Sequence, residues 1–377
     1  MVSGLWHITF LEWELGLSVR MIHFHFINIV WGDSYIDLFL NASLPTQLTS
    51  GNLLHFGNEK RTRYTIYTTL KDAKIIKNSL AFHTLSDLIN TKIVLIDEFV
   101  HKEKYITMTQ CHRQAIQEAK DEGAALVFLH PDCIWPDGSF TKLANIARMG
   151  KRVVLHSQVH VVKETFFPVL LEIFSSRKDL GITFSSHTLF KLALKHLHPF
   201  NKSLCWDATH FEKWPSQIYW KVGNEGFLVR CFYMHPLMVI PSRGNILPSG
   251  NIDDGYISTI YPNWNDIHIV DDSDEIFNVA ISDTHGLSNL DPAHRLSPLE
   301  IARWAQLHTT TYHQHLFQHK IRIHDENPSK KWRKIEKHSD KIVAQINFWF
   351  KFLNHVPKPL FRNKLLKNVY KQSLSYL

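Results

Sequence analysis

One segment constrains the fold more than any other, the run of residues 123–154. Its apolar strand over 124–129 ends abruptly in His130-Pro131-Asp132, and a polar turn, a short helix and a second apolar strand follow. This succession is typical of a parallel α/β sheet. Because open α/β sheets bind ligands where the carboxyl end of a strand meets its loop, Asp132 is the first candidate site residue.

The rest of the chain supports the same fold class. The patterns predict strands at residues 24–30, 64–69, 92–99, 152–162 and 267–282. They predict helices at residues 33–44, where Pro45 should end the helix, and at 109–122, 297–310 and 334–353. Strands that alternate with helices predict a mainly parallel central sheet with helices on both faces.

A chain of 377 residues is long enough for about two domains, and we expect one main domain with appendages. Residues 1–20 are expected to form an N-terminal extension, 21–290 the main α/β domain, and 291–377 a helical, basic C-terminal region. Within the main domain, we expect residues 21–165 and 166–290 to form two halves. Residues 199–265 are dense in Trp, Pro, Asn, Asp and His, which favours strands and long loops over a sheet edge.

Charge and cysteine content narrow the possible classes of protein. The formal charge is +7, and residues 328–377 hold twelve basic and two acidic side chains, so the body of the chain is slightly acidic. A nucleic-acid-binding core would need a basic face on that body, so we expect no nucleic-acid partner. The four cysteines lack CxxC spacing, which fits a reducing cytosol.

The N-terminus and the hydropathy pattern point to the same compartment. No apolar run reaches the roughly 18 residues of a membrane helix. The first residues lack the basic start of a signal peptide, because Glu12 and Glu14 interrupt the apolar stretch without a preceding positive charge. We therefore expect a cytoplasmic protein.

Several well-known motifs are absent from the sequence. It contains no GxGxxG after the first strand, no Walker loop, no GxSxG and no HExxH. Carboxylates and histidines at strand ends therefore remain as candidates. Asp132 suits a divalent cation that bridges a diphosphate, because oxygen ligands suit Mg²⁺ and Mn²⁺; alternatively, Asp132 caps the turn before the next helix.

Two later segments offer further candidates. Asp207 follows Trp206 among other aromatic residues, and such a carboxylate can act as general base beside a sugar; the alternative is an ordinary loop Asp. His235 begins a His-Pro pair beside a predicted strand and is either a metal ligand or a structural histidine. The acidic residues 271–275 lack the spacing of an EF-hand and favour a solvated turn.

Three HxH pairs resemble zinc ligands only in isolation. They are His23 with His25, His196 with His198, and His313 with His315. Residues i and i+2 of a strand share a face, but no third ligand follows at a convincing spacing. The sequence therefore does not predict a zinc site, although a His-rich metallohydrolase remains a third interpretation of the chain.

The basic tail has two interpretations. Ile342, Ile346, Trp349 and Phe350 stand among lysines so that an apolar face could enter an anionic membrane surface. The same face could instead pack on the body of the protein, with its basic side solvated.

The segments that carry a family resemblance are the first strand with WGDSYIDLFLNASLPTQLTSGNL, then LVFLHPDCIWPDGSF, WPSQIYW with FYMHPLMV, and IHIVDDSDE. Through them the chain resembles bacterial glycosyltransferases with a GT-A-like, nucleotide-diphospho-sugar-binding fold. The resemblance spans about residues 22–285. It implies a sugar transferred from a nucleotide-diphosphate donor to an acceptor hydroxyl, with a glycan or a lipid-linked molecule as acceptor. The implied pathway is the synthesis of cell-surface glycans or of secondary glycosides.

The resemblance also implies roles for particular residues. Asp132 and His235 would hold Mn²⁺ or Mg²⁺, and Asp207 would be the catalytic base. The donor would contact the residues Asn28, Trp31, Tyr35, His130 and Asp132. The family pattern is Asp-x-Asp, whereas here His130 stands in place of the first acid. The alternative is therefore a non-catalytic carbohydrate-binding or assembly protein on a transferase-like fold, with the tail as a peripheral contact at the inner membrane face.

Overall fold

The computed structural model describes residues 22–175, 181–242, 244, 246–253, 255–287, 295–325 and 329–355. The chain divides into two compact units: Met1–Pro199 with Met234–Leu287, and Phe200–Tyr233 with Ser288–Leu377. The predicted extension over 1–20 and the basic tail beyond residue 355 lie outside the described residues. Within these ranges, none of the helices combines the length and the hydropathy of a membrane span.

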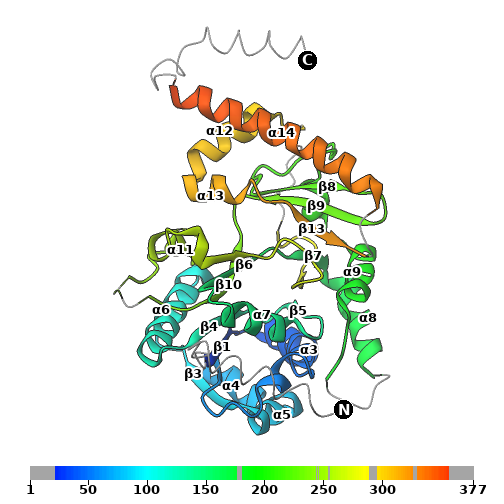
Figure 1. Ribbon diagram of the computed structural model, residues 1–377. Helices are drawn as coiled ribbons and strands as arrows, with labels where there is room; N and C mark the ends of the chain where they lie inside the picture. Colours follow the sequence, from blue (N-terminus) through cyan, green and yellow to red (C-terminus); the bar gives the residue numbers. More distant parts are fainter. Residues whose placement is uncertain are drawn as a thin grey trace, which may run out of the picture. The chain divides into compact units, whose positions relative to one another are not determined.

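The first unit contains a seven-stranded sheet in the order β11-β6-β10-β4-β1-β2-β3 (Figure 1). Its strands are β1 Phe24–Ile29, β2 Arg63–Thr68, β3 Asn90–Leu95, β4 Ala125–Leu129, β6 Val153–His156, β10 His235–Val239 and β11 Ile267–Ile269. Neighbouring strands are parallel except β10, which runs antiparallel to both β4 and β6. The prediction of an α/β fold with a mainly parallel central sheet is confirmed.

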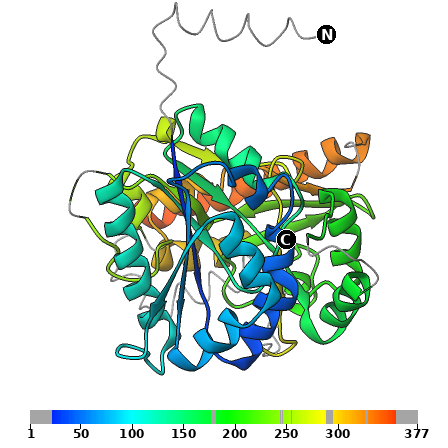
Figure 2. The ribbon, with the colours of Figure 1, turned by 90° about the horizontal axis from the view of Figure 1, so that it is seen from below.

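Helices cover both faces of this sheet (Figure 2). Phe24 and Phe26 of β1 point into an apolar cluster with Phe56 and Phe140. On the other face, Ile27 lies against the helix α6 (Lys104–Glu122). All six residues of β1 are buried, which is the pattern of a strand covered on both sides.

The remaining helical segments of the first unit are short. They are α2 Asp33–Leu38, the π-helix η1 Phe39–Ser43, α3 Leu44–Gln47, the 3₁₀ segment η2 Leu53–Phe56, α4 Leu70–Lys77, α5 Leu80–Leu88, α7 Ser139–Arg148, α8 Lys163–Ser175, α9 Ser186–Lys195, α11 Tyr256–Ile260 and η3 Trp264–Asp266.

The first predicted helix does not end at Pro45. Instead, α2 continues through η1 into α3, and Pro45 occupies the first turn of α3. Pro45 lacks the backbone N–H that would continue the helical ladder, and the wider π-helical turn η1 directly precedes it. The expected stop was therefore wrong.

Two segments that were expected to be single strands are each shared between the central sheet and a second, three-stranded sheet. It contains β5 Cys133–Ile134, β12 Val279–Ser282 and β7 Val159–Val162 in the order β5-β12-β7. The predicted strand over 152–162 is divided between β6 and β7, and Ser157 and Gln158 at the division are both buried and polar. Likewise, the predicted strand over 267–282 is divided between β11 and β12, because the chain passes from one sheet to the other.

The second unit has its own antiparallel sheet, in the order β13-β9-β8. Its elements are α10 Pro199–Ser203, which begins at the boundary of the units, β8 Gln217–Lys221, β9 Gly226–Cys231, α12 Pro298–His308, α13 Thr311–Leu316, β13 Ile321–His324 and α14 Lys330–His355. Ser297 and Glu300 form the predicted capping box at the start of α12. Gly226 pairs with His324, and a Cβ at Gly226 would lie 2.1 Å from the carbonyl oxygen of Ile323.

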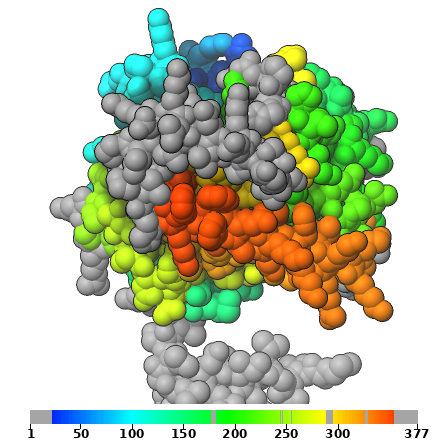
Figure 3. Space-filling view, turned by 90° about the horizontal axis from the view of Figure 1, so that it is seen from above, coloured from blue at the N-terminus to red at the C-terminus, as the bar shows by residue number. Residues whose placement is uncertain are grey.

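Helix α14 buries most of the apolar face that the sequence indicated. Ile342, Ile346 and Phe350 are all buried, and α14 is the orange-to-red helix in Figures 1 and 3. Asp340 of this helix accepts a hydrogen bond from the buried Arg230 of β9 at 2.5 Å. These three apolar residues therefore pack within the protein rather than face a membrane.

Candidate functional site

Three histidines converge at the carboxyl edge of the parallel strands. His130 follows β4, His156 ends β6, and His235 begins β10. Because β10 is antiparallel, its first residue lies at the edge where the parallel strands end, and His235 pairs with His156 in the ladder. The ring centroid of His235 lies 5.9 Å from that of His130 and 6.3 Å from that of His156.

Burial keeps two of these imidazoles neutral. It lowers the pKa of His130 to about 3 and that of His156 to about 3, and in each case the neighbouring His235 lowers it further. His235 is about a third exposed, and its Nδ1 lies 3.7 Å from Oδ2 of Asp253. A neutral imidazole is the form that binds metal ions.

Asp132 lies beside this group. One ligand atom each from His130, Asp132 and Cys133 can be chosen so that all lie within 4.8 Å of one another. Burial raises the pKa of the Asp132 carboxyl to about 6, while its own backbone and the Lys104 charge act in the opposite direction. Strongly shifted carboxyl groups at a strand end are typical of functional sites, although structural networks also produce them.

A polar layer that the sequence did not predict lies on the smaller sheet. Asn278 donates from Nδ2 to Cys133 Sγ at 3.2 Å and to Gln158 Oε1 at 3.4 Å. The His160 Nδ1 lies 3.1 Å from the hydroxyl of Ser282. These residues come from distant segments that β5, β7 and β12 bring together, so no local spacing could have indicated them.

The residues after β1 contribute the predicted Trp31 and Tyr35. Trp31 is half-buried, and Tyr35 is 41% exposed. Partial burial raises the pKa of the Tyr35 hydroxyl, Lys104 lowers it, and the charges of Asp132 and Asp283 raise it further. The charge of Asp132 thus acts on Tyr35, and the two residues follow the strands β4 and β1.

Asn28 has a different environment. It lies inside β1 with no exposed surface, beside the buried hydroxyl of Tyr64. A donor contact at Asn28 therefore stays a prediction.

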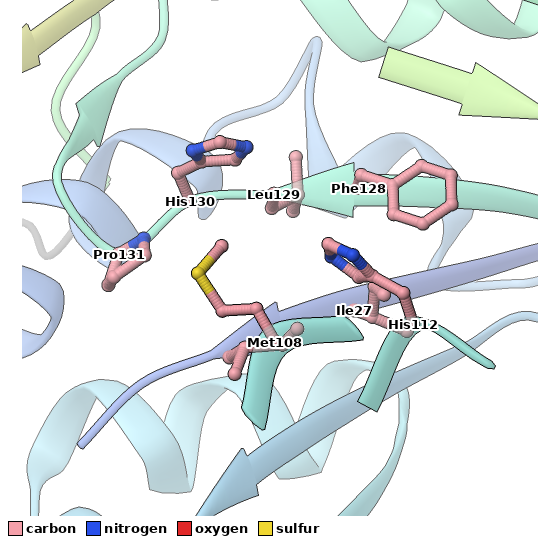
Figure 4. A pocket seen from close by; sticks show the side chains of 8 residues that line it. Ile27, Met108, His112, Phe128, Leu129, His130 and Pro131 are labelled. Atoms are coloured by element: carbon pink, nitrogen blue, oxygen red, sulfur yellow. The ribbon is translucent and has the colours of Figure 1, made fainter. Parts of the chain in front are cut away.

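A small pocket opens between α6 and the ends of β1 and β4 (Figure 4). Its lining is apolar except for two imidazoles, those of His130 and His112. The His112 ring packs edge-on against Phe128, with centroids 5.2 Å apart, and burial lowers the pKa of His112 to about 4. Through His130, the pocket adjoins the candidate site.

The predicted base, Asp207, belongs to the second unit. It is exposed in the loop between α10 and β8. The neighbouring Trp206 is buried and stacks on Trp220, with centroids 6.2 Å apart. Trp206 is therefore a core residue, and the role of Asp207 stays a prediction.

The donor set at the sheet edge can be compared with the expected cofactor. Asp132 supplies a carboxylate, and His130 and His235 supply imidazoles. Imidazole suits Mn²⁺ and later transition metals better than Mg²⁺, which prefers oxygen ligands. These residues can therefore hold a divalent cation: the carboxylate suits Mn²⁺ and Mg²⁺ alike, and the imidazoles favour Mn²⁺.

Comparisons with known proteins add little to this description. No family model matches the chain, and no curated protein matches its sequence. The chain is similar to TarS of S. aureus at 12% identity and a TM-score of 0.33, over 86% of this chain and 43% of TarS, so it spans less than half of that protein. It is also similar to mouse xyloside xylosyltransferase 1 at 10% identity and a TM-score of 0.24, over 40% of this chain and 58% of that one. At such TM-scores the likeness carries no argument, and the fold assignment rests on the sheet topology.

Proposed function

We propose that the protein is a glycosyltransferase that moves a sugar from a nucleotide-diphosphate donor to an acceptor hydroxyl. The observation that carries the proposal is the convergence of Asp132, His130 and His235 at the carboxyl edge of the parallel strands. Ligands of open α/β sheets bind at this edge. The acceptor would be a glycan or a lipid-linked molecule, and the protein would act in the cytoplasm.

Each residue has a distinct part in this proposal. Above about pH 6, Asp132 is ionised and supplies the negative charge of the site. His130 stays neutral and offers a ring nitrogen, and the carboxylate of Asp253 lies 3.7 Å from Nδ1 of His235. When bound, Mn²⁺ would offset the charge that develops on the departing diphosphate. Asp207, exposed to solvent, would accept the proton of the acceptor hydroxyl.

Thermal-shift measurements with UDP-, GDP- and CMP-sugars, each with and without Mn²⁺, test the donor site. We expect sugars of one nucleotide class to raise the melting temperature of the wild type. Asp132→Asn should abolish the part of this rise that depends on Mn²⁺. The matched control is Asp87→Asn on the exposed side of α5, which should respond like the wild type. If none of the donors raises the melting temperature of the wild type, the proposal is contradicted.

The single carboxylate favours a second candidate, a non-catalytic carbohydrate-binding or assembly protein. The family pattern that the chain resembles has two acids at this position, whereas this chain has His130 and Asp132. Isothermal titration combined with product analysis distinguishes the candidates. Donor binding with neither hydrolysis nor transfer, under conditions that saturate the site, would support the binding protein.

A further inference from the structure

A second group of potential ligands lies at the opposite edge of the central sheet. His23 and His25 stand at the amino end of β1 and are 8% and 1% exposed. The end of α6 brings Glu122 to them, and the Nε2 of His25 lies 2.9 Å from Oε2 of Glu122. The third ligand that no HxH spacing indicated is thus supplied by a helix much further along the chain.

The backbone fixes this arrangement. Gly123 ends α6 in the left-handed conformation, with φ 67°. The next residues enter β4, and the backbone N–H of Ala125 donates to the carbonyl oxygen of His23 at 3.0 Å. The two histidines share one face of the strand because they are two residues apart. The β1–β4 ladder therefore holds the end of α6 beside both imidazoles.

The three side chains have the spacing of a metal site. One ligand atom from each lies within 4.8 Å of the others. The two imidazole centroids are 5.7 Å apart with an angle of 64° between the rings. The Nε2 of His23 and the Nδ1 of His25 are buried and have no hydrogen-bond partner in the described part of the chain. An ion pair between His25 and Glu122 alone would not explain why the Nε2 of His23 is buried without a hydrogen-bond partner.

Hydrogen bonds around the group hold its carboxylate in place. Arg63 donates to Oε1 of Glu122 at 2.6 Å, which fixes the carboxylate and leaves Oε2 directed at His25. The charge of Arg63 is shared with Glu118, whose Oε2 accepts at 2.8 Å. Burial lowers the pKa of His25 to about 4, with Arg63 lowering it further and Glu122 opposing, so the imidazole is neutral and able to bind a metal.

We propose that His23, His25 and Glu122 bind a zinc ion that joins the start of β1 to the end of α6. Two imidazoles and one carboxylate are a donor set that Zn²⁺ prefers, and a water would take the fourth position. The nearby Arg61 and Arg63 oppose a cation, so we expect weaker binding than at a four-cysteine site. This proposal is independent of the donor site, because it uses none of the same residues.

The test is a titration of the metal-free full-length protein with Zn²⁺, monitored by calorimetry. A parallel titration with Co²⁺, which substitutes for Zn²⁺, is monitored by absorption spectroscopy. The titration uses the Asp132→Asn variant, which lacks the carboxylate of the donor site. In this background, we expect one equivalent of Zn²⁺ to bind and to raise the melting temperature. His25→Gln should lose that equivalent, whereas the control His83→Gln, at an exposed position on α5, should retain it.

Glu122→Gln provides a second variant in case the buried His25→Gln does not fold. Glu122 is 43% exposed, so its replacement should leave the fold intact while reducing zinc affinity at least tenfold. The proposal is overturned if the Asp132→Asn protein binds no zinc. It is equally overturned if Glu122→Gln binds zinc with unchanged affinity and stoichiometry.

Discussion

Replacement of Asp132 by asparagine should stabilise the metal-free protein at neutral pH. Burial raises the pKa of this carboxyl from 3.8 to about 6, so the folded protein holds the proton more tightly than the unfolded chain does. Stability from this group is therefore present below about pH 4 and is lost as the pH rises through 6. An asparagine side chain is neutral at every pH, so the variant avoids that loss.

The size of the effect follows from the shift. One pKa unit corresponds to about 1.4 kcal/mol, so a shift of about two units gives an upper limit of about 3 kcal/mol. Asp132 is partly exposed, and solvent screening reduces the expected gain to about 1–2 kcal/mol. For 377 residues that unfold together, that gain corresponds to a rise in melting temperature of about 1–3 °C.

Thermal unfolding of wild type and Asp132→Asn in EDTA, from pH 4 to pH 8, measures this difference. EDTA is needed because a bound cation would stabilise only the wild type. The difference should be smallest near pH 4 and largest above pH 7, and Asp87→Asn should show no such dependence. If Asp132→Asn is no more stable than the wild type at pH 8, burial does not raise the pKa of Asp132 as described.

Three further predictions concern single residues elsewhere. Ser297→Ala removes the cap of α12 and should cost about 1 kcal/mol in urea unfolding; an unchanged midpoint would show that the capping box adds nothing. Gly226→Ala places a methyl group against the Ile323 carbonyl and should cost more than about 2 kcal/mol in the same assay, whereas a neutral result would rule out the close approach of β9 and β13. Burial raises the pKa of the Cys133 thiol well above its usual value, so mass spectrometry should find it alkylated at pH 8 only after unfolding; rapid labelling of the native protein would contradict this burial.

The sequence predicted those parts of the fold that depend on local pattern. The continuous apolar character of residues 124–129 indicated a buried strand, and β4 is buried along its whole length. Likewise, Ser297, Pro298 and Glu300 indicated the start of α12 at the residue where it begins. In both cases, the physical cause lies within a few residues.

The sequence did not predict features that depend on long-range pairing. Nothing near His235 indicates that β10 runs antiparallel between β4 and β6, and this direction is what brings His235 to His156. Similarly, His23 and His25 lacked a third ligand until the end of α6 supplied Glu122. The candidate residue Asp132 was accessible to sequence reasoning because it closely follows an apolar strand, whereas the histidines beside it come mostly from other strands.

The division of the chain between its two units has a consequence for synthesis on the ribosome. Every strand of the first unit has been made once residue 287 is complete, so this unit can fold before the chain is finished. Strand β9, by contrast, ends at Cys231, long before its partner β13 begins at Ile321. During that interval one edge of β9 has no strand to pair with, and unpaired edges promote aggregation. The nascent chain is therefore most vulnerable between the synthesis of β9 and that of β13.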